Sequence, residues 1–125
     1  MAAIAQGALA DDAKSPLAES KTNTIGYPDV ATARKELLAR KDAQSHIEGN
    51  GWLVIEVPSE LTIWTFTPET DPAYPAVVKR VVTHDADGES ISMEVLCQAS
   101  KSACDNLVRQ FQQLNEQMKE SLSHH

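Results

Sequence analysis

The sequence predicts an α+β domain. It is expected to consist of an N-terminal helix, then an antiparallel meander of four or five strands, and then a long C-terminal helix that packs on the sheet. Two observations predict this fold. The middle of the chain holds short runs rich in β-branched and aromatic residues, separated by clusters of turn residues. Two stretches whose apolar residues recur at helical spacing flank that region. The length of 125 residues suits one domain, and the apolar (42%) and charged (23%) fractions are those of a globular protein.

The first helix is expected from about Asp29 to Asp42. Pro28 precedes it, at a position where a missing N–H costs nothing, and Asp29 suits a helix cap. Four apolar residues then fall on one stripe, which is expected to pack on the sheet: Val30, Ala33, Leu37 and Leu38.

Five strands are expected after this helix. Asn50-Gly51 indicates a tight hairpin, because a type I′ turn needs positive φ at both central residues, and Asp87-Gly88 indicates a second hairpin. The segment 67–75 holds three prolines, so it is expected to be a loop. The expected strands are residues 45–48, 52–57, 61–66, 76–83 and 89–97.

The last element is expected to be a helix from about Ser102 to Leu122. Ser102 followed by Asp105 resembles a capping box, with Asp in place of Glu. A continuous apolar stripe predicts that one side packs on the sheet; it consists of Cys104, Leu107, Val108, Phe111, Leu114, Met118 and Leu122.

The N-terminus carries a pattern found at secretory cleavage sites. The first ten residues are uncharged and mostly small, and they end in Ala8-Leu9-Ala10 before Asp11-Asp12. Such an A-x-A pattern is typical of the end of a bacterial signal peptide, with cleavage after Ala10. The alternative is the disordered, alanine-rich tail of a cytosolic protein. We therefore divide the chain into a signal-peptide remnant (1–10), a disordered segment (11–26), a single domain (27–122) and a tail (123–125) whose His124-His125 are native or a tag remnant.

The only two cysteines, Cys97 and Cys104, lie where the last strand meets the last helix. In an exported protein an even number of cysteines usually forms disulfides. Their C-x6-C spacing matches neither the C-x-x-C of thiol oxidoreductases nor paired zinc knuckles. Both side chains are expected on apolar faces that meet, which favours a structural disulfide. Two free buried thiols are the alternative.

Composition and motifs exclude several classes of function. The formal net charge of −7 argues against a nucleic-acid partner and against docking on anionic lipid headgroups. No apolar run approaches the roughly 18 residues of a transmembrane helix, so no membrane insertion is expected. The chain has no nucleophile elbow, H-E-x-x-H, phosphate loop or dinucleotide-binding motif. We therefore assign no catalytic residue, no metal ligand and no cofactor.

The remaining polar candidates are expected on the surface. His46 lies in a weak edge strand and His84 opens a turn, where a lone histidine is usually solvated. Asp85, Asp87 and Glu89 surround that turn, but an EF-hand needs a longer loop that ends in a bidentate Glu.

Trp52, Trp64 and Tyr74 are the candidate ligand- or partner-binding residues. The two tryptophans lie on neighbouring expected strands and share a face only if the intervening turn gives them the same parity, which the sequence leaves open. Core packing is the alternative for both. Tyr74 lies in the proline-rich loop, and binding residues often lie on loops above a rigid sheet.

Two stretches, TFTPETDPAYPAVVKR and CQASKSACDNLVRQFQQLNEQM, resemble a group of small proteins exported by proteobacteria. The resemblance covers roughly Tyr27 to Glu120 and implies a signal peptide, one helix–sheet–helix domain and paired cysteines. Some members are labelled DnaJ-type molecular chaperones. A J-domain needs a His-Pro-Asp tripeptide, and here no His precedes a Pro. The resemblance therefore implies export and a disulfide but no activity.

Three functional hypotheses follow. The leading one is a periplasmic, non-enzymatic binding or interaction domain for a small ligand or an envelope protein. The second is a small enzyme that uses carboxylates such as Glu56 or Asp71, and the third is an accessory subunit recognised through the polar face of the last helix. If both helices cover the same face of the sheet, the apolar residues on the other face also suggest a homodimer.

Overall fold

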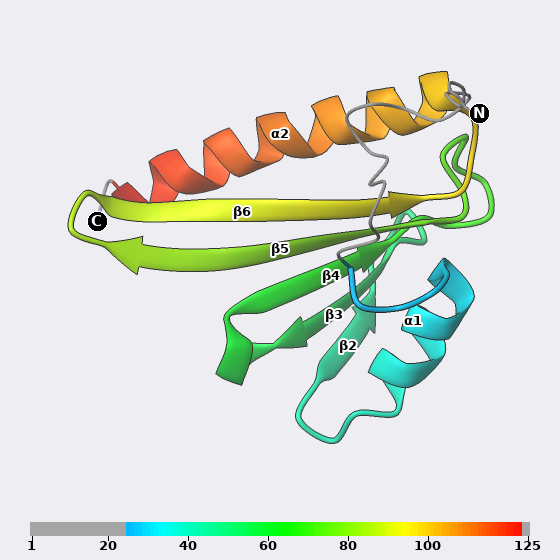
Figure 1. Ribbon diagram of the computed structural model, residues 1–125, viewed down its shortest axis with the longest axis horizontal. Helices are drawn as coiled ribbons and strands as arrows, with labels where there is room; N and C mark the ends of the chain where they lie inside the picture. Colours follow the sequence, from blue (N-terminus) through cyan, green and yellow to red (C-terminus); the bar gives the residue numbers. More distant parts are fainter. Residues whose placement is uncertain (1–24, 124–125) are drawn as a thin grey trace, which may run out of the picture.

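The structure is a computed structural model that describes residues 25–123. Figure 1 shows one twisted sheet, with a long helix along one side and a short helix near the other. The predicted α+β fold, with its antiparallel meander and its C-terminal helix on the sheet, is confirmed. The elements are α1 (Val30–Leu38), β2 (Gln44–Ile47), β3 (Leu53–Val57), the 3-10 helix η1 (Pro58–Glu60), β4 (Thr62–Phe66), β5 (Ala76–Asp85), β6 (Gly88–Cys97) and α2 (Lys101–Ser123).

The five strands pair in sequence order, and each neighbour is antiparallel. Antiparallel neighbours in sequence need no long crossover, and the longest connection in this sheet is the loop of residues 67–75. The longest pairing joins β5 and β6, which have ten residues each. Strand β5 runs two residues beyond the predicted end at Thr83, and the turn there leaves only Ala86 and Asp87 unpaired.

The two helices cover opposite faces of the sheet. Leu53, Phe66 and Val77 lie side by side on the face that packs against α1, which we call the α1 face. Ala76 and Val78 belong to the other face, the α2 face, where they pack against the apolar stripe of α2. Because α2 follows β6 directly, it lies along β5 and β6 (Figure 1). The helix therefore does not cover the α2 face of strands β2–β4. A homodimer was suggested only if both helices covered the same face of the sheet. That condition is not met.

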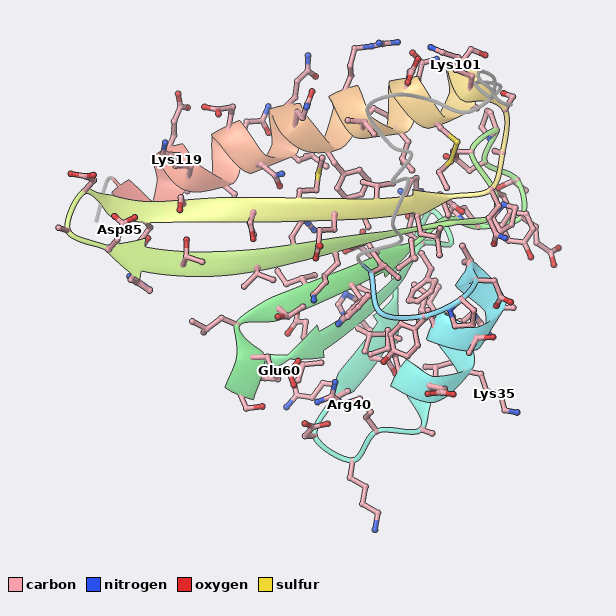
Figure 2. All side chains as sticks on the ribbon, in the orientation of Figure 1. Lys35, Arg40, Glu60, Asp85, Lys101 and Lys119 are labelled. Atoms are coloured by element: carbon pink, nitrogen blue, oxygen red, sulfur yellow. A yellow bond between two sulfur atoms is a disulfide. The ribbon has the colours of Figure 1, made fainter. Side chains whose placement is uncertain are left out.

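Helix α1 begins where the sequence predicts but ends earlier. The Asp29 carboxylate caps it by accepting a hydrogen bond from the Thr32 N–H at 2.7 Å. The expected end at Asp42 is wrong, because the chain leaves the helix after Leu38. The Arg40 guanidinium then binds both Asp42 and Glu60, which ties the connection to η1 (Figure 2). Leu38, the last residue of the helix, is exposed rather than part of the packed stripe.

The β2–β3 hairpin differs from the predicted type I′ turn. Strand pairing and the hydrogen bond from Glu48 N–H to Trp52 O leave a three-residue loop, residues 49–51. Only Gly51 has positive φ, at 93°, whereas Asn50 does not. This arrangement matches the three-residue hairpin loop, in which a type I turn is followed by one left-handed residue. The hairpin itself is where the sequence predicts it.

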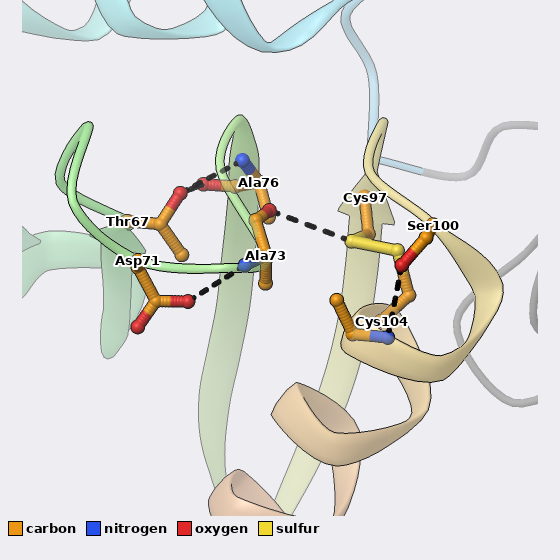
Figure 3. The surroundings of a disulfide bond; sticks show 8 residues. Thr67, Asp71, Ala73, Ala76, Cys97, Ser100 and Cys104 are labelled. Carbon is orange, nitrogen blue, oxygen red and sulfur yellow. Dashed lines mark hydrogen bonds between the residues drawn. A yellow bond between two sulfur atoms is a disulfide. The ribbon is translucent and has the colours of Figure 1, made fainter.

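The start of α2 is joined to the end of β6 by the predicted disulfide (Figure 3). Cys97 and Cys104 are bonded with an S–S distance of 2.06 Å and a Cα–Cα distance of 5.9 Å. Both side chains are buried in the core under α2, together with Leu107 and Val108. The Cys97 sulfur also lies 3.7 Å from the Ala73 carbonyl oxygen, but a disulfide sulfur carries no hydrogen, so we count this as a contact only.

The cap of α2 differs from the predicted Ser102–Asp105 box. The helix begins at Lys101, and the Ser100 hydroxyl accepts a hydrogen bond from the Ala103 N–H at 3.3 Å. Asp105 instead pairs with Lys101 one turn earlier, at 3.0 Å. The capping side chain is therefore two residues before the expected one.

The predicted cleavage site after Ala10 and the pair His124-His125 lie outside the described residues. The described part starts at Ile25, which is only 3% exposed and packs in the core under α1. Packed structure thus begins before the predicted domain start at Tyr27.

Candidate functional site

The structure places the two tryptophans on opposite faces of the sheet. Trp64 lies opposite Ile55 on the α1 face and is 3% exposed. The Tyr27 ring meets it edge-on at 5.8 Å, and the Lys79 ammonium lies 5.3 Å from the Trp64 ring centre. Trp64 therefore packs in the core beneath α1, and no surface of its ring is open to a ligand.

Trp52 lies on the α2 face, half-buried, with its ring 5.9 Å from that of Phe111 in α2. The two rings line a groove of about 740 Å³ between α2 and the uncovered strands β2–β4. We call this the α2–sheet groove. Its floor and walls consist of His46, Glu48, Asn50, Trp52, Val54, Glu56, Ile63, Thr65, Asp71, Arg80, Gln110, Phe111, Gln113, Leu114 and Gln117.

Arg80 lies on the floor of this groove. It stands opposite Ile63 and Met93 in the sheet, and its guanidinium carbon is 5.1 Å from the centre of the Phe111 ring. Its buried Nε has no hydrogen-bond partner. None of the ion pairs among residues 25–123 includes its guanidinium. Arg80 is thus a half-buried cation without an ion-pair partner in that part of the chain.

The surroundings of Arg80 shift its pKa in two directions. Desolvation by burial lowers the pKa below the usual arginine value, and the Glu48 carboxylate acts from a distance to raise it. An arginine pKa starts so high that the group stays charged at neutral pH. The groove therefore presents a permanent positive charge beside two aromatic rings.

Other polar groups around Arg80 can form hydrogen bonds to a ligand. Along α2, three exposed glutamine side chains form the facing wall: Gln110, Gln113 and Gln117. A glutamine amide both donates and accepts hydrogen bonds, so this wall suits a polar ligand.

Within residues 25–123, neither carboxylate named in the enzyme hypothesis, Glu56 or Asp71, forms an ion pair with a histidine. Glu56 and Asp71 both line the groove, but the Asp71 carboxylate accepts a hydrogen bond from the Ala73 N–H at 2.8 Å and so stabilises its own loop. The acid–histidine contact in the groove is between His46 and Glu48, 3.6 Å apart and both exposed. A general base or acid with a shifted pKa is usually found in a more buried setting.

His84 lies at the tip of the β5–β6 hairpin, where it contacts Glu89 at 3.2 Å. The neighbouring Asp85 accepts a hydrogen bond from the Asp87 N–H at 2.9 Å, as turn residues often do. The described residues contain no group of three or more potential metal ligands.

Tyr74 lies away from the α2–sheet groove. Its loop is held by the Thr67 hydroxyl, which accepts a hydrogen bond from the Ala76 N–H at 3.0 Å, and its bond to Pro75 is cis (Figure 3 shows the loop). The Tyr74 side chain, 45% exposed, lines a second depression of about 790 Å³ beside α1, with Arg34 and Lys35. The three candidate aromatic residues thus occupy three different environments.

Arg80, Phe111 and the glutamines line the groove although the sequence patterns did not predict them as site residues. The alternation of side chains along β5 indicated that Arg80 faces inward. Arg80 lies two and four positions after Val78 and Ala76, and both of these residues face the core. A charged residue at an inward position of a strand is unusual and often functional. Phe111 was assigned to the packed stripe of α2, where it also belongs.

None of the helices in residues 25–123 is long and apolar enough to cross a membrane. Comparison of the chain with protein-family models, with curated proteins and with solved structures finds no match in any of the three.

Proposed function

We propose that the protein is a periplasmic, non-enzymatic binding domain that holds an organic anion in the α2–sheet groove. The observation that carries this proposal is the guanidinium of Arg80 on the floor of the groove, whose Nε has no hydrogen-bond partner and which forms no ion pair with residues 25–123. The Nε–H of this guanidinium is removed from water, and a buried polar group without a hydrogen-bond partner is costly. A carboxylate can bind a guanidinium through two parallel hydrogen bonds, so a bound anion would offset that cost.

The rest of the groove favours an organic ligand over an inorganic ion. The rings of Trp52 and Phe111 offer an apolar surface beside the charge. Binding sites for organic molecules typically combine such surfaces with a few polar groups that fix orientation. Of the three aromatic candidates, this proposal uses only Trp52.

The location in the periplasm is supported by two features. The Cys97–Cys104 disulfide is of the kind that persists in oxidising compartments. Ala8-Leu9-Ala10 matches a signal-peptide cleavage site.

An NMR titration of the uniformly 15N-labelled protein tests the binding proposal. The ligand 3-phenylpropionate carries an aromatic ring and a carboxylate, and 3-phenylpropanamide is its uncharged analogue. We expect the acid to shift the indole N–H signal of Trp52 and the Nε–H signal of Arg80, while the indole signal of Trp64 stays in place as an internal control. The amide should cause little change, because it lacks the charge that pairs with Arg80.

Two variants sharpen this test. Arg80→Gln should abolish the shifts caused by the acid, whereas Arg34→Gln, in the depression beside Tyr74, should leave them unchanged. Equal shifts from the acid and the amide, or shifts centred on Tyr74, would contradict the proposal.

A further inference from the structure

The glutamine wall of the α2–sheet groove matches an extended chain. Gln110, Gln113 and Gln117 follow each other along one side of α2 over seven residues, which is about 10 Å at the rise of an α-helix. Three residues of an extended peptide cover about the same length. Each peptide unit offers one donor and one acceptor, and each glutamine amide offers both in return. The wall therefore fits a linear ligand with repeated amide groups.

The charges in the groove are separated in space. Glu56 lies opposite Ile63, and Ile63 lies opposite Arg80, so Glu56 and Arg80 are two strands apart on the same face. At the usual strand spacing their Cα atoms are roughly 10 Å apart. Glu48 adds a second carboxylate on the side of β2 and β3. The groove thus carries a positive charge at Arg80 and negative charges at Glu48, Glu56 and Asp71.

This separation constrains the charges of the ligand. Besides a carboxylate for Arg80, Glu48 and Glu56 favour a ligand that also carries a cationic group. The two charges of a free amino acid are roughly 3 Å apart from standard bond lengths, which is too short to reach both sides of the groove. A peptide end can do so, because its terminal carboxylate and a basic side chain two residues earlier are further apart.

We infer that the ligand of the α2–sheet groove is the C-terminal end of an extended peptide, with its carboxylate on Arg80, an apolar last side chain on Trp52 and Phe111, and a basic side chain two residues earlier facing Glu56. Residues two apart in an extended chain point to the same side, so the apolar and the basic side chains can both face the floor. This inference rests on the proposed function, since it uses the same site and names the ligand class.

Fluorescence anisotropy with labelled hexapeptides tests it on the full, disulfide-bonded chain. The reference probe is Gly-Gly-Ser-Lys-Ser-Val with a free C-terminal carboxylate. One analogue ends in a carboxamide, and another has Gln in place of Lys. We expect the amide to bind about tenfold more weakly, which corresponds to ~1.4 kcal/mol. The Gln analogue should bind about threefold more weakly, because it keeps the length but loses the charge facing Glu56.

Protein variants then assign each preference to its residue. Arg80→Gln should remove the preference for the free carboxylate and keep the preference for Lys, and Glu56→Gln should do the reverse. Glu116→Gln, an exposed change on α2 outside the groove, should leave both preferences intact. Arg80→Lys serves as a second variant, which keeps the charge and should retain part of the preference for the carboxylate.

The outcomes separate this inference from the proposed function. If 3-phenylpropionate shifts Trp52 but the peptides bind no more tightly than it does, the site exists and the peptide inference is overturned. Equal affinity for the acid and amide peptides also overturns it, even if Arg80→Gln were to unfold. If neither 3-phenylpropionate nor any peptide binds, both proposals fail.

Discussion

Removal of the Cys97–Cys104 disulfide should lower the stability of the domain substantially. The bond closes a short loop, with a sequence separation of 7, and the chain-entropy estimate for such a loop is about 2.5 kcal/mol. Replacing both cysteines by alanine is the suitable change, because serine would bury two hydroxyl groups in an apolar core. For a domain of this size, we expect a fall in melting temperature of roughly 10 to 20 °C.

Thermal unfolding followed by circular dichroism measures this effect, with and without reductant. The oxidised wild type should be the most stable form, and the reductant should bring it close to the double alanine variant. The variant itself should not respond to the reductant, which provides the control for other effects of the reagent. Alkylation of the unfolded protein without reductant should add nothing to the wild type.

Two results would refute this reasoning. One is a melting temperature of the double variant within a few degrees of the oxidised wild type. The other is the uptake of two alkyl groups by wild-type protein that has never been reduced, since it would mean that the thiols are free.

Core packing, helix capping and export each give a further expected outcome. Leu37→Ala removes a fully buried side chain (0% exposed) from the core under α1. It should lower the free energy of unfolding, measured by urea denaturation, by ~2–5 kcal/mol. The control Leu38→Ala, at a 42% exposed position, should change this free energy by less than ~1 kcal/mol. The hydrogen bond from Thr32 lowers the pKa of the Asp29 carboxyl, so its contribution to stability is present above the unfolded-state pKa of ~3.9 and lost as the pH falls through the lower folded-state value. Asp29→Asn should therefore differ from the wild type in urea denaturation at pH 7 and converge with it at the acid end; a constant difference at every pH would contradict the assignment. Protein from a periplasmic extract should begin at Asp11 by intact mass spectrometry, and a full-length chain there would argue against cleavage after Ala10.

The sequence determines much of this fold because its local patterns act independently of distant contacts. Asp29 caps α1 through a hydrogen bond only three residues away. Alternating side chains and clusters of turn residues define five strands, and short connections make them pair in order. The disulfide also follows from local geometry, since Cys97 and Cys104 lie at one strand–helix junction with a sequence separation of only 7. The early end of α1 was not predictable in this way, because Arg40 leaves the helical pattern to bind Glu60, twenty positions along the chain.

The candidate site depends on tertiary structure. Side chains in a strand alternate with a period of two, so one residue more or less in the η1 turn would reverse the faces of everything after it. Leu61, with φ of 52°, completes that turn and places Trp64 opposite Ile55, which puts Trp64 in the core and leaves Trp52 on the other face. The path of α2 over β5 and β6 then brings Phe111 onto Arg80 and leaves the neighbouring strands open. The sequence by itself thus determined the elements, their order and the disulfide. Only the packing of α2 across the sheet decided which side chains form a groove, because that packing brings together residues that are far apart in the sequence.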